Sequence, residues 1–313
     1  MRERIEYLVA WFFLKTLESL PRPLARRVSA FVAKCLFILR PPLQRAAQFN
    51  LRLAFPELPE SARRRIITRM VRNVGWMAVE FARMPRYTRG HIESVIILEG
   101  FEHFIAAERR GKGVLLLTGH MGAWELGPFA HAVFGSPINF LMRPIDNTMV
   151  NRIVNRYRCA SGNRPIRKNE SARVILRILK SGGVVGVLAD QNTIATEAVF
   201  VDFFGTPAST TTGIARLARR TGAAVVPAYT YWDSKLAKYR LSYEPALELP
   251  STGDEQSDIR DYCTRFNHVI EDYIRRFPDQ WLWVHRRWKN RPPAEAAVYP
   301  DEQSECIKEA QND

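Results

Sequence analysis

The sequence predicts an α/β fold with a mixed, mostly parallel central sheet, helices on both faces, and a basic N-terminal helical layer that associates with a membrane. From about residue 94 onward, short aliphatic runs alternate with helical patterns, as in sheets whose strands are buried on both faces. The first 90 residues show helical periodicity instead, and they carry 18 Lys and Arg against six Asp and Glu. Of the 313 residues, 46% are hydrophobic, which suits a large core and excludes a disordered chain.

The helical periodicity of the N-terminal region is clearest between residues 60 and 84. Apolar side chains recur there at steps of three and four residues, namely Ile67, Met70, Val71, Val74, Met77, Ala78 and Phe81. Arginines fall mostly on the opposite side, and Pro85 ends the pattern. This spacing predicts one long amphipathic helix.

Two shorter apolar runs, residues 7–14 and 28–39, precede this helix and are flanked by arginines. Neither reaches the roughly 20 apolar residues that a membrane-spanning helix needs. The first run also lacks the small-residue cleavage site of a signal peptide. Apolar runs between clustered cations are typical of helices that lie in the face of an anionic membrane. Ordinary core helices of a soluble protein are the alternative.

The second part of the chain is expected to build the sheet. Strands are predicted at residues 95–98, 114–118, 138–142, 184–189 and 224–231, and helices at 101–110, from 123, from 147, at 170–180 and at 210–220. Residues 238–243 alternate and predict an antiparallel edge strand, and residues 257–277 predict a last long helix. We therefore expect a helical membrane-associated region (1–90), an α/β domain with the active site (91–292) and an acidic, mobile tail (293–313).

The spacing of the cysteines argues against a disulfide framework and against a metal site. Cys35, Cys159, Cys263 and Cys306 are far apart and form no pair at zinc-ligand spacing, so we expect free thiols and no bound metal. The sequence also lacks a G-x-S-x-G nucleophile elbow and a phosphate-binding P-loop. Acyl-serine, phosphoryl-transfer and metallohydrolase mechanisms therefore have no support in the sequence.

One segment, Leu115-Leu-Leu-Thr-Gly-His120-Met-Gly-Ala-Trp-Glu125, places a histidine at the end of a predicted strand. Ligands of open α/β sheets bind at this edge. A histidine there can act as a general base near neutral pH when a carboxylate fixes its tautomer. Glu125 would point about 140° away on a continuous helix, so a pair with His120 requires a turn, which Gly122 permits. A histidine that merely caps a helix is the alternative.

The spacing of His120 and Glu125 after an aliphatic strand resembles the H-x4-D/E motif of the glycerolipid-type acyltransferase superfamily. The segment is most similar to the lauroyl and myristoyl acyltransferases of lipid A biosynthesis. Further segments match that family in the same order: Arg143-Pro-Ile-Asp-Asn147, Arg156-Tyr-Arg158, Ile166-Arg-Lys-Asn-Glu170, Ala189-Asp-Gln191, Phe200-Val-Asp-Phe-Phe-Gly205, Thr210-Thr-Thr-Gly213 and His285-Arg-Arg-Trp-Lys-Asn-Arg-Pro292. Gly119 and Ala189 depart from the residues usual in the family. The resemblance covers most of residues 10–292.

The resemblance implies an enzyme that transfers a fatty acyl group from a thioester on acyl carrier protein to a hydroxyl group of a lipid A precursor, without a cofactor. His120 would remove the proton of the acceptor hydroxyl, and Glu125 would stabilise the imidazolium that forms. The implied partners are acyl carrier protein, the glycolipid acceptor and membrane lipids. The implied location is the cytoplasmic face of the inner membrane, with attachment through the N-terminal helices.

Further site residues are carried over from the matching segments. Arg158 and Asp190 would bind substrate or support the transition state, and a structural ion pair, even with one another, is the alternative for each. Arg156 takes this role if Arg158 faces away. Other candidates for substrate binding are Arg143, Asn147 and Arg286. The block 281–292 interleaves aromatic residues with cations and would grip a phosphorylated sugar, rest at the membrane interface or pack on the sheet.

The sequence leaves two other functions open. An acyltransferase of the same superfamily that acts on another glycolipid or on an aminolipid would carry the same motif. The net charge of +14 would also suit a nucleic-acid-binding protein. Against this, the cations lie among aliphatic runs, and no helix-turn-helix, RNP or zinc-finger signature is present. The arginine run 63–65 would dock either the acidic acyl carrier protein or anionic lipid head groups.

Overall fold

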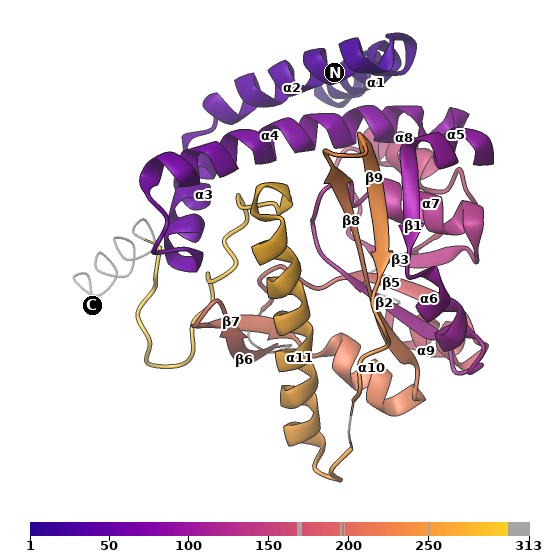
Figure 1. The fold of residues 1–313 in the computed structure, drawn as a ribbon, viewed down its shortest axis with the longest axis vertical. Coiled ribbons are helices and arrows are strands. Elements are labelled where there is room, and N and C mark those ends of the chain that lie inside the picture. Colours follow the sequence, from indigo (N-terminus) through magenta and orange to yellow (C-terminus); the bar gives the residue numbers. More distant parts are fainter. Residues whose placement is uncertain (168–170, 195, 197, 250, 300–313) are drawn as a thin grey trace.

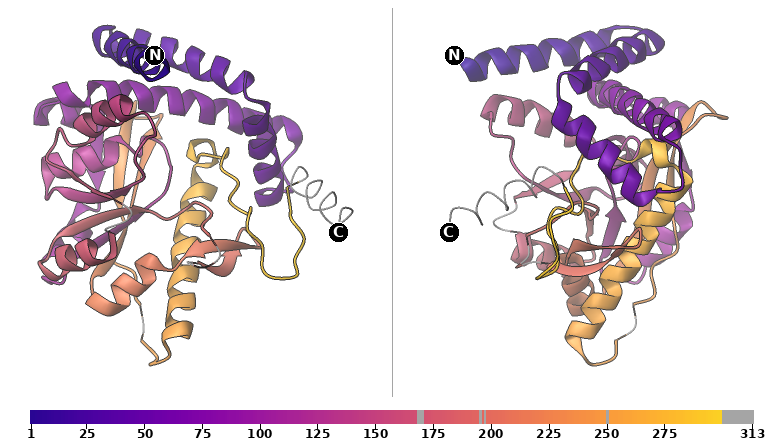
Figure 2. Two further views of the ribbon diagram at one scale, coloured as in Figure 1. Left: turned by 180° about the vertical axis from the view of Figure 1, so that it is seen from behind. Right: turned by 90° about the vertical axis from the view of Figure 1, so that its left-hand side faces the viewer.

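The computed structural model describes residues 1–167, 171–194, 196, 198–249 and 251–299. The chain begins with a helical layer made of α1 (Arg2–Ser19), α2 (Arg22–Ile38), α3 (Pro41–Ala54) and α4 (Glu60–Arg83), followed by the short helices η1 (Met84–Arg86) and α5 (Arg89–Val95). α1 and α2 form the outermost layer, and α4 lies beneath them against the rest of the molecule (Figure 1, Figure 2). α4 confirms the predicted long helix.

A seven-stranded sheet forms the centre of the molecule. Its strands, in spatial order, are β1 (Ile96–Glu99), β9 (Lys238–Tyr243), β8 (Ala224–Asp233), β2 (Val114–Thr118), β5 (Val184–Leu188), β3 (Ile138–Met142) and β4 (Arg164–Arg167). Neighbours from β8 to β4 pair in parallel, whereas β9 is antiparallel to β8 and parallel to β1. The predicted mixed, mostly parallel sheet is therefore confirmed.

Helices cover both faces of this sheet, as the side chains of β2 show. Leu115 and Leu117 pack in one core with α9 (Ser171–Lys180), α10 (Gly213–Thr221) and α11 (Glu255–Arg276). Val114 and Leu116 pack in a second core with α6 (Phe101–Glu108), α7 (Leu126–Phe134) and α8 (Thr148–Arg158). Because both faces of β2 are buried, its sequence is a continuous aliphatic run without polar alternation.

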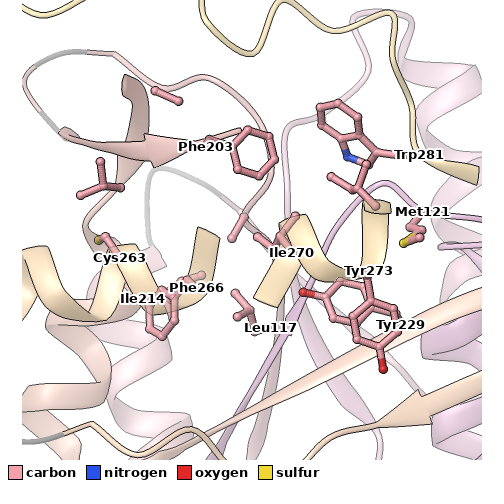
Figure 3. Close-up of a cluster of buried hydrophobic side chains, with 14 of the residues drawn as sticks. Leu117, Met121, Phe203, Ile214, Tyr229, Cys263, Phe266, Ile270, Tyr273 and Trp281 are labelled. Carbon is pink, nitrogen blue, oxygen red and sulfur yellow. The ribbon is translucent and has the colours of Figure 1, made fainter. Parts of the chain in front are cut away.

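The first core reaches the segments that surround the end of β2 (Figure 3). Phe203 belongs to a hairpin of β6 (Ala198–Phe203) and β7 (Thr206–Thr211), and its ring centroid lies 5.9 Å from that of Trp281. Met121, three residues after β2, forms an antiparallel bridge with Trp281. Full burial of a large apolar side chain contributes about 1.5–3 kcal/mol. These contacts therefore fix the loop that follows β2.

α4 crosses the edge of the sheet at which β8 ends (Figure 1). Trp76 on α4 contacts Trp232 near the end of β8, with ring centroids 5.1 Å apart. Since β8, β2 and β5 are parallel, this is the carboxyl edge of all three strands. No helix among the described residues is long and apolar enough to cross a membrane.

Several expectations differ from the structure. The helix predicted at 210–220 begins at Gly213, because residues 206–211 pair with β6 instead. β9 is not an edge strand, because β1 pairs with its other side. The hairpin β6–β7 and the strand β4 were not predicted. Tyr299, which falls in the expected tail 293–313, is buried, and its hydroxyl donates to Asn50 Oδ1 at 2.7 Å. The rest of that tail, 300–313 with Cys306, lies outside the described residues.

Candidate active site

His120 and Asp190 come together because their strands are neighbours in the sheet. β2 and β5 pair in parallel with Thr118 opposite Leu188, and each of the two candidates lies two residues beyond its strand. Parallel strands end at a common edge, which is where open α/β sheets bind ligands. His120 and Asp190 therefore lie side by side at the carboxyl edge of the sheet.

Both carboxylate oxygens of Asp190 bind His120. The backbone N–H of His120 donates to Oδ2, and the ring atom Nδ1 lies next to Oδ1, each at 2.8 Å. The indole N–H of Trp281 also donates to Oδ2, at 2.7 Å. A carboxylate at Nδ1 favours the tautomer with the proton on Nδ1, which leaves the lone pair on Nε2. The amide nitrogen of Gln191 lies 3.3 Å from each ring nitrogen, and 19% of the His120 side chain is exposed.

The pKa values of this pair move in opposite directions. Burial lowers the pKa of His120, but the charge and the hydrogen bond of Asp190 outweigh burial and raise this pKa above its ordinary value. Burial raises the pKa of Asp190, but the charge and hydrogen bonds of His120 and the indole of Trp281 lower it to about 2. Asp190 therefore stays ionised, and its charge stabilises His120 when the ring takes up a proton.

Glu125 is bound to Arg158 and not to His120. The Arg158 Nε donates to Glu125 Oε2 at 2.8 Å, and Nη2 donates to Oε1. The carboxylate that contacts the His120 ring is therefore Asp190, where the motif spacing favoured Glu125. Glu125 acts on His120 through its charge, which raises the pKa of the ring, whereas the Arg158 charge lowers it. Arg158 and Asp190 lie in two separate ion pairs.

The turn between His120 and Glu125 depends on Gly122, as the sequence predicted. Gly122 has a φ of 54°, and a Cβ at this position would lie 2.2 Å from the carbonyl oxygen of Thr230. Its N–H donates to the Gln280 carbonyl at 2.7 Å, and Leu282 N–H donates to the His120 carbonyl at 3.0 Å. The C-terminal segment therefore holds the loop on both sides of the turn.

Two residues near the start of α8, which were expected to bind substrate, contact residues other than His120 and Asp190. Arg143 is exposed, and its Nη2 lies 3.8 Å from Asp146 Oδ1. Asn147 caps α8, because its Oδ1 accepts hydrogen bonds from the backbone N–H of Met149 and Val150. Its amide group also donates to Glu6 Oε2 on α1, at 2.9 Å. Asn147 thus ties α8 to the N-terminal layer.

Arg156 and Arg286 line two separate cavities. Arg156 lines a cavity of about 270 Å³ between α8 and α1. Arg158, the other arginine of the matching segment, pairs with Glu125. Arg286 lines a cavity of about 200 Å³ together with Arg45 and Arg52 of α3.

The aromatic and cationic block 281–292 packs in the core, which was one of its three expected roles. Its tryptophans are buried, namely Trp281, Trp283 and Trp288. Arg287 is fully buried and donates to the Ser209 carbonyl and to Thr210 Oγ1 of β7. His285 Nε2 accepts the backbone N–H of Asn192 at 2.9 Å, and burial lowers the pKa of His285 to about 4. This contact fixes the chain just after Asp190, a role that sequence reasoning missed because no local pattern signals it.

The arrangement can carry out acid–base chemistry. A carboxylate-bound histidine with its lone pair on Nε2 can accept a proton from a hydroxyl group, and an arginine beside it can stabilise negative charge. No group of three or more His, Cys, Asp or Glu side chains that could hold a metal ion occurs in the part of the chain that the structure describes. Cys35, Cys159 and Cys263 are free thiols.

Comparison with known proteins identifies the family of the chain. Residues 1–290 match the family model for bacterial lipid A biosynthesis acyltransferases. The chain is 29% identical to the lipid A biosynthesis palmitoleoyltransferase of Escherichia coli (strain K12), over 94% of this chain and 95% of that protein. It is 27% identical to the lauroyltransferase of the same organism with the same coverage, and 24% identical to its myristoyltransferase over 88% and 83% of the two chains. The chain therefore belongs to the bacterial lipid A biosynthesis acyltransferase family and is an acyltransferase.

Proposed function

We propose that the protein transfers a fatty acyl chain from the thioester of acyl carrier protein to a hydroxyl group of a lipid A precursor. The observation that carries this proposal is the bond of His120 Nδ1 to the buried, ionised Asp190 at the carboxyl edge of the sheet. That bond leaves Nε2 to accept a proton. The names of the relatives, which are palmitoleoyl-, lauroyl- and myristoyltransferases of lipid A biosynthesis, support the acyl group and the acceptor.

His120 acts as the general base in the proposed reaction. Its Nε2 removes the proton of the acceptor hydroxyl while the oxygen attacks the thioester carbonyl, and the C–S bond then breaks. The same proton passes from His120 to the leaving thiolate, so the ring returns to its neutral state. Asp190 positions the ring and stabilises the imidazolium. Arg158, held by Glu125, stabilises the negative charge that develops on the carbonyl oxygen.

The proposed location is the cytoplasmic face of the inner membrane, with α1 and α2 lying in the lipid interface. On α1, Ile5, Leu8, Val9 and Phe12 recur on one side and are 55% to 69% exposed. On α2, the exposed residues Leu24, Phe31 and Ile38 recur every seven residues. Arg27 and Lys34 lie on the same side of α2, because they are three residues after Leu24 and Phe31. Exposed apolar stripes with cations are typical of interfacial helices.

The arginines of α4 form a candidate surface for the acidic donor protein. Arg64, Arg65 and Arg69 are exposed, whereas Arg63 is bound to the carbonyl groups of Phe55 and Leu58. The docking surface proposed here therefore consists of Arg64, Arg65 and Arg69. Complementary charge at this surface would raise the association rate of the donor protein.

Mass spectrometry of reaction products tests the proposed function. The full-length protein in neutral detergent is incubated with acyl carrier protein or coenzyme A thioesters, and with a lipid A precursor, a mannosylated inositol lipid or an ornithine lipid as acceptor. We expect an acylated lipid A precursor, formed faster from the carrier-protein thioester, and formed about a hundredfold to ten-thousandfold more slowly by the variant His120→Ala. Acylation of one of the other acceptors in place of the lipid A precursor would contradict the proposed acceptor.

A further inference from the structure

We propose that the cavity between α1 and α8 binds the phosphate group of an anionic lipid, at a site distinct from the proposed active site. The cavity is open to the surface, has a volume of about 270 Å³ and is lined by Tyr7, Trp11, Met149, Arg152, Ile153 and Arg156. None of these residues belongs to the group of His120, Glu125, Arg158 and Asp190. The inference therefore does not depend on the proposed acyl transfer.

Two guanidinium groups line this cavity without a carboxylate partner. Arg152 and Arg156 lie four residues apart on α8, so their side chains project from one face of the helix. In the described part of the chain, neither lies within ion-pair distance of an acidic side chain, whereas the neighbouring Arg158 is bound to Glu125. Arginine pairs bind phosphate through bidentate, charge-assisted hydrogen bonds. The cavity thus has the charge and the donors for a phosphate group.

The α1 side of the cavity indicates that this phosphate belongs to a lipid. Tyr7 and Trp11 lie one turn apart on α1 and line the cavity, and Tyr and Trp are favoured at the level of lipid head groups. The residues next to them, Leu8 and Phe12, are 58% and 69% exposed. With these apolar side chains in the lipid, the two guanidinium groups lie at head-group level, and the acyl chains of the bound lipid run along α1.

The position of α1 beside α8 is fixed by Asn147. Its amide group donates to the Glu3 carbonyl and to Glu6 Oε2, each at 2.9 Å, while its Oδ1 caps α8. The two walls of the cavity are therefore tied together before a lipid binds, which lowers the entropic cost of binding.

A vesicle-binding assay on the full chain tests this inference. The variant Arg152→Gln/Arg156→Gln removes both cavity cations, which are exposed and have no carboxylate partner in the described structure. The control variant Arg109→Gln/Arg110→Gln removes two exposed cations that follow α6 and do not line the cavity. Vesicles of neutral lipid contain either phosphatidic acid, which has a terminal phosphate, or phosphatidylserine. The two lipid contents are adjusted until both kinds of vesicle have the same zeta potential. An unchanged thermal transition shows that each variant is folded.

Wild type and the control variant should bind the phosphatidic acid vesicles about tenfold more tightly than the phosphatidylserine vesicles. Because the two kinds of vesicle have the same surface charge, only recognition of the head group can distinguish them. The Arg152→Gln/Arg156→Gln variant should bind both vesicles alike. Equal binding of both vesicles by wild type, or an undiminished preference in the cavity variant, would overturn the proposal. Millimolar inorganic phosphate should leave the preference unchanged. If it abolishes the preference, the ligand is free phosphate and the assignment to a lipid is wrong.

Discussion

At the scale of single residues, the two carboxylates near His120 have different contacts and therefore different proposed roles. Asp190 is buried and binds both the backbone and the ring of His120, so its proposed role is to set the position and the tautomer of that ring. Glu125 holds Arg158 and affects the ring through charge. The motif spacing points to Glu125 because it is close in sequence, whereas the contact of His120 with Asp190 spans 70 residues.

The pH profile of Asp190→Asn distinguishes a positioning role from a merely structural one. His120 must be neutral to accept a proton, so activity falls as the pH drops through its pKa, which Asp190 raises. Loss of the carboxylate charge lowers this pKa. The acid limb of kcat/KM should therefore move to lower pH, while kcat falls about a hundredfold to ten-thousandfold because the tautomer is no longer fixed. An acid limb that stays in place in this variant would argue against the role of Asp190.

At the scale of elements, a strand that is buried on both faces of the sheet could be predicted from the sequence. The strand at 114–118 has the predicted bounds because its buried aliphatic run can be recognised without knowledge of its partner strands. The mostly apolar segment 138–142 also has its predicted bounds, although only Ile138 and Met142 are buried. Strand β7 escaped prediction because its sequence, TPASTT, contains a proline and small residues, and it becomes a strand by pairing with β6. The site residues predicted from the motif are local in sequence. Trp281, which donates to Asp190, and His285, which binds the backbone of Asn192, lie far from the motif in the sequence.

Gly122→Ala tests whether the turn between β2 and α7 is needed for activity. The added Cβ would collide with the Thr230 carbonyl, so the loop and His120 should shift, with a loss of stability of about 1–3 kcal/mol and of most activity. Gly111→Ala is the matched control, because Gly111 also has a positive φ, of 67°, but an added Cβ there would meet no atom within 4 Å. Activity should survive in the control. Equal activity of both variants would mean that the turn does not position His120.

The arginines of α4 are tested with two donors. Arg65→Glu/Arg69→Glu should raise the KM for an acyl carrier protein thioester about tenfold at low salt, with little effect on a minimal thioester without the protein. The acceptor is dispersed in neutral detergent, and Arg109→Glu/Arg110→Glu, two exposed arginines after α6, serves as the control. Equal losses with both donors would contradict donor docking at α4 and favour binding of anionic lipid there.

At the scale of the whole molecule, the N-terminal layer combines packing with an exposed apolar surface. Arg22 and Arg26 of α2 bind Glu80 of α4, whose side chain is fully buried. Removal of residues 1–40 would therefore leave a buried carboxylate without its cations and would damage the fold. Substitution of exposed side chains is the better test of membrane attachment.

Leu8→Asp/Phe12→Asp should release the protein from vesicles of anionic lipid, because both apolar side chains would be lost from the interface. Ile194→Asp/Leu236→Asp changes two side chains that are also exposed, at 56% and 44%, but lie outside α1 and α2. Co-sedimentation should show the loss in the first variant alone. Equal sedimentation of the two variants would show that α1 does not hold the protein on the membrane.

The proposed role of His120 is tested most directly by the turnover of His120→Ala. Acyl transfer from a carrier-protein thioester to a lipid A precursor is measured under saturating conditions, with circular dichroism to establish that the fold is intact. Loss of a general base predicts a decrease in kcat of about a hundredfold to ten-thousandfold. A folded variant with turnover near that of wild type would contradict the mechanism.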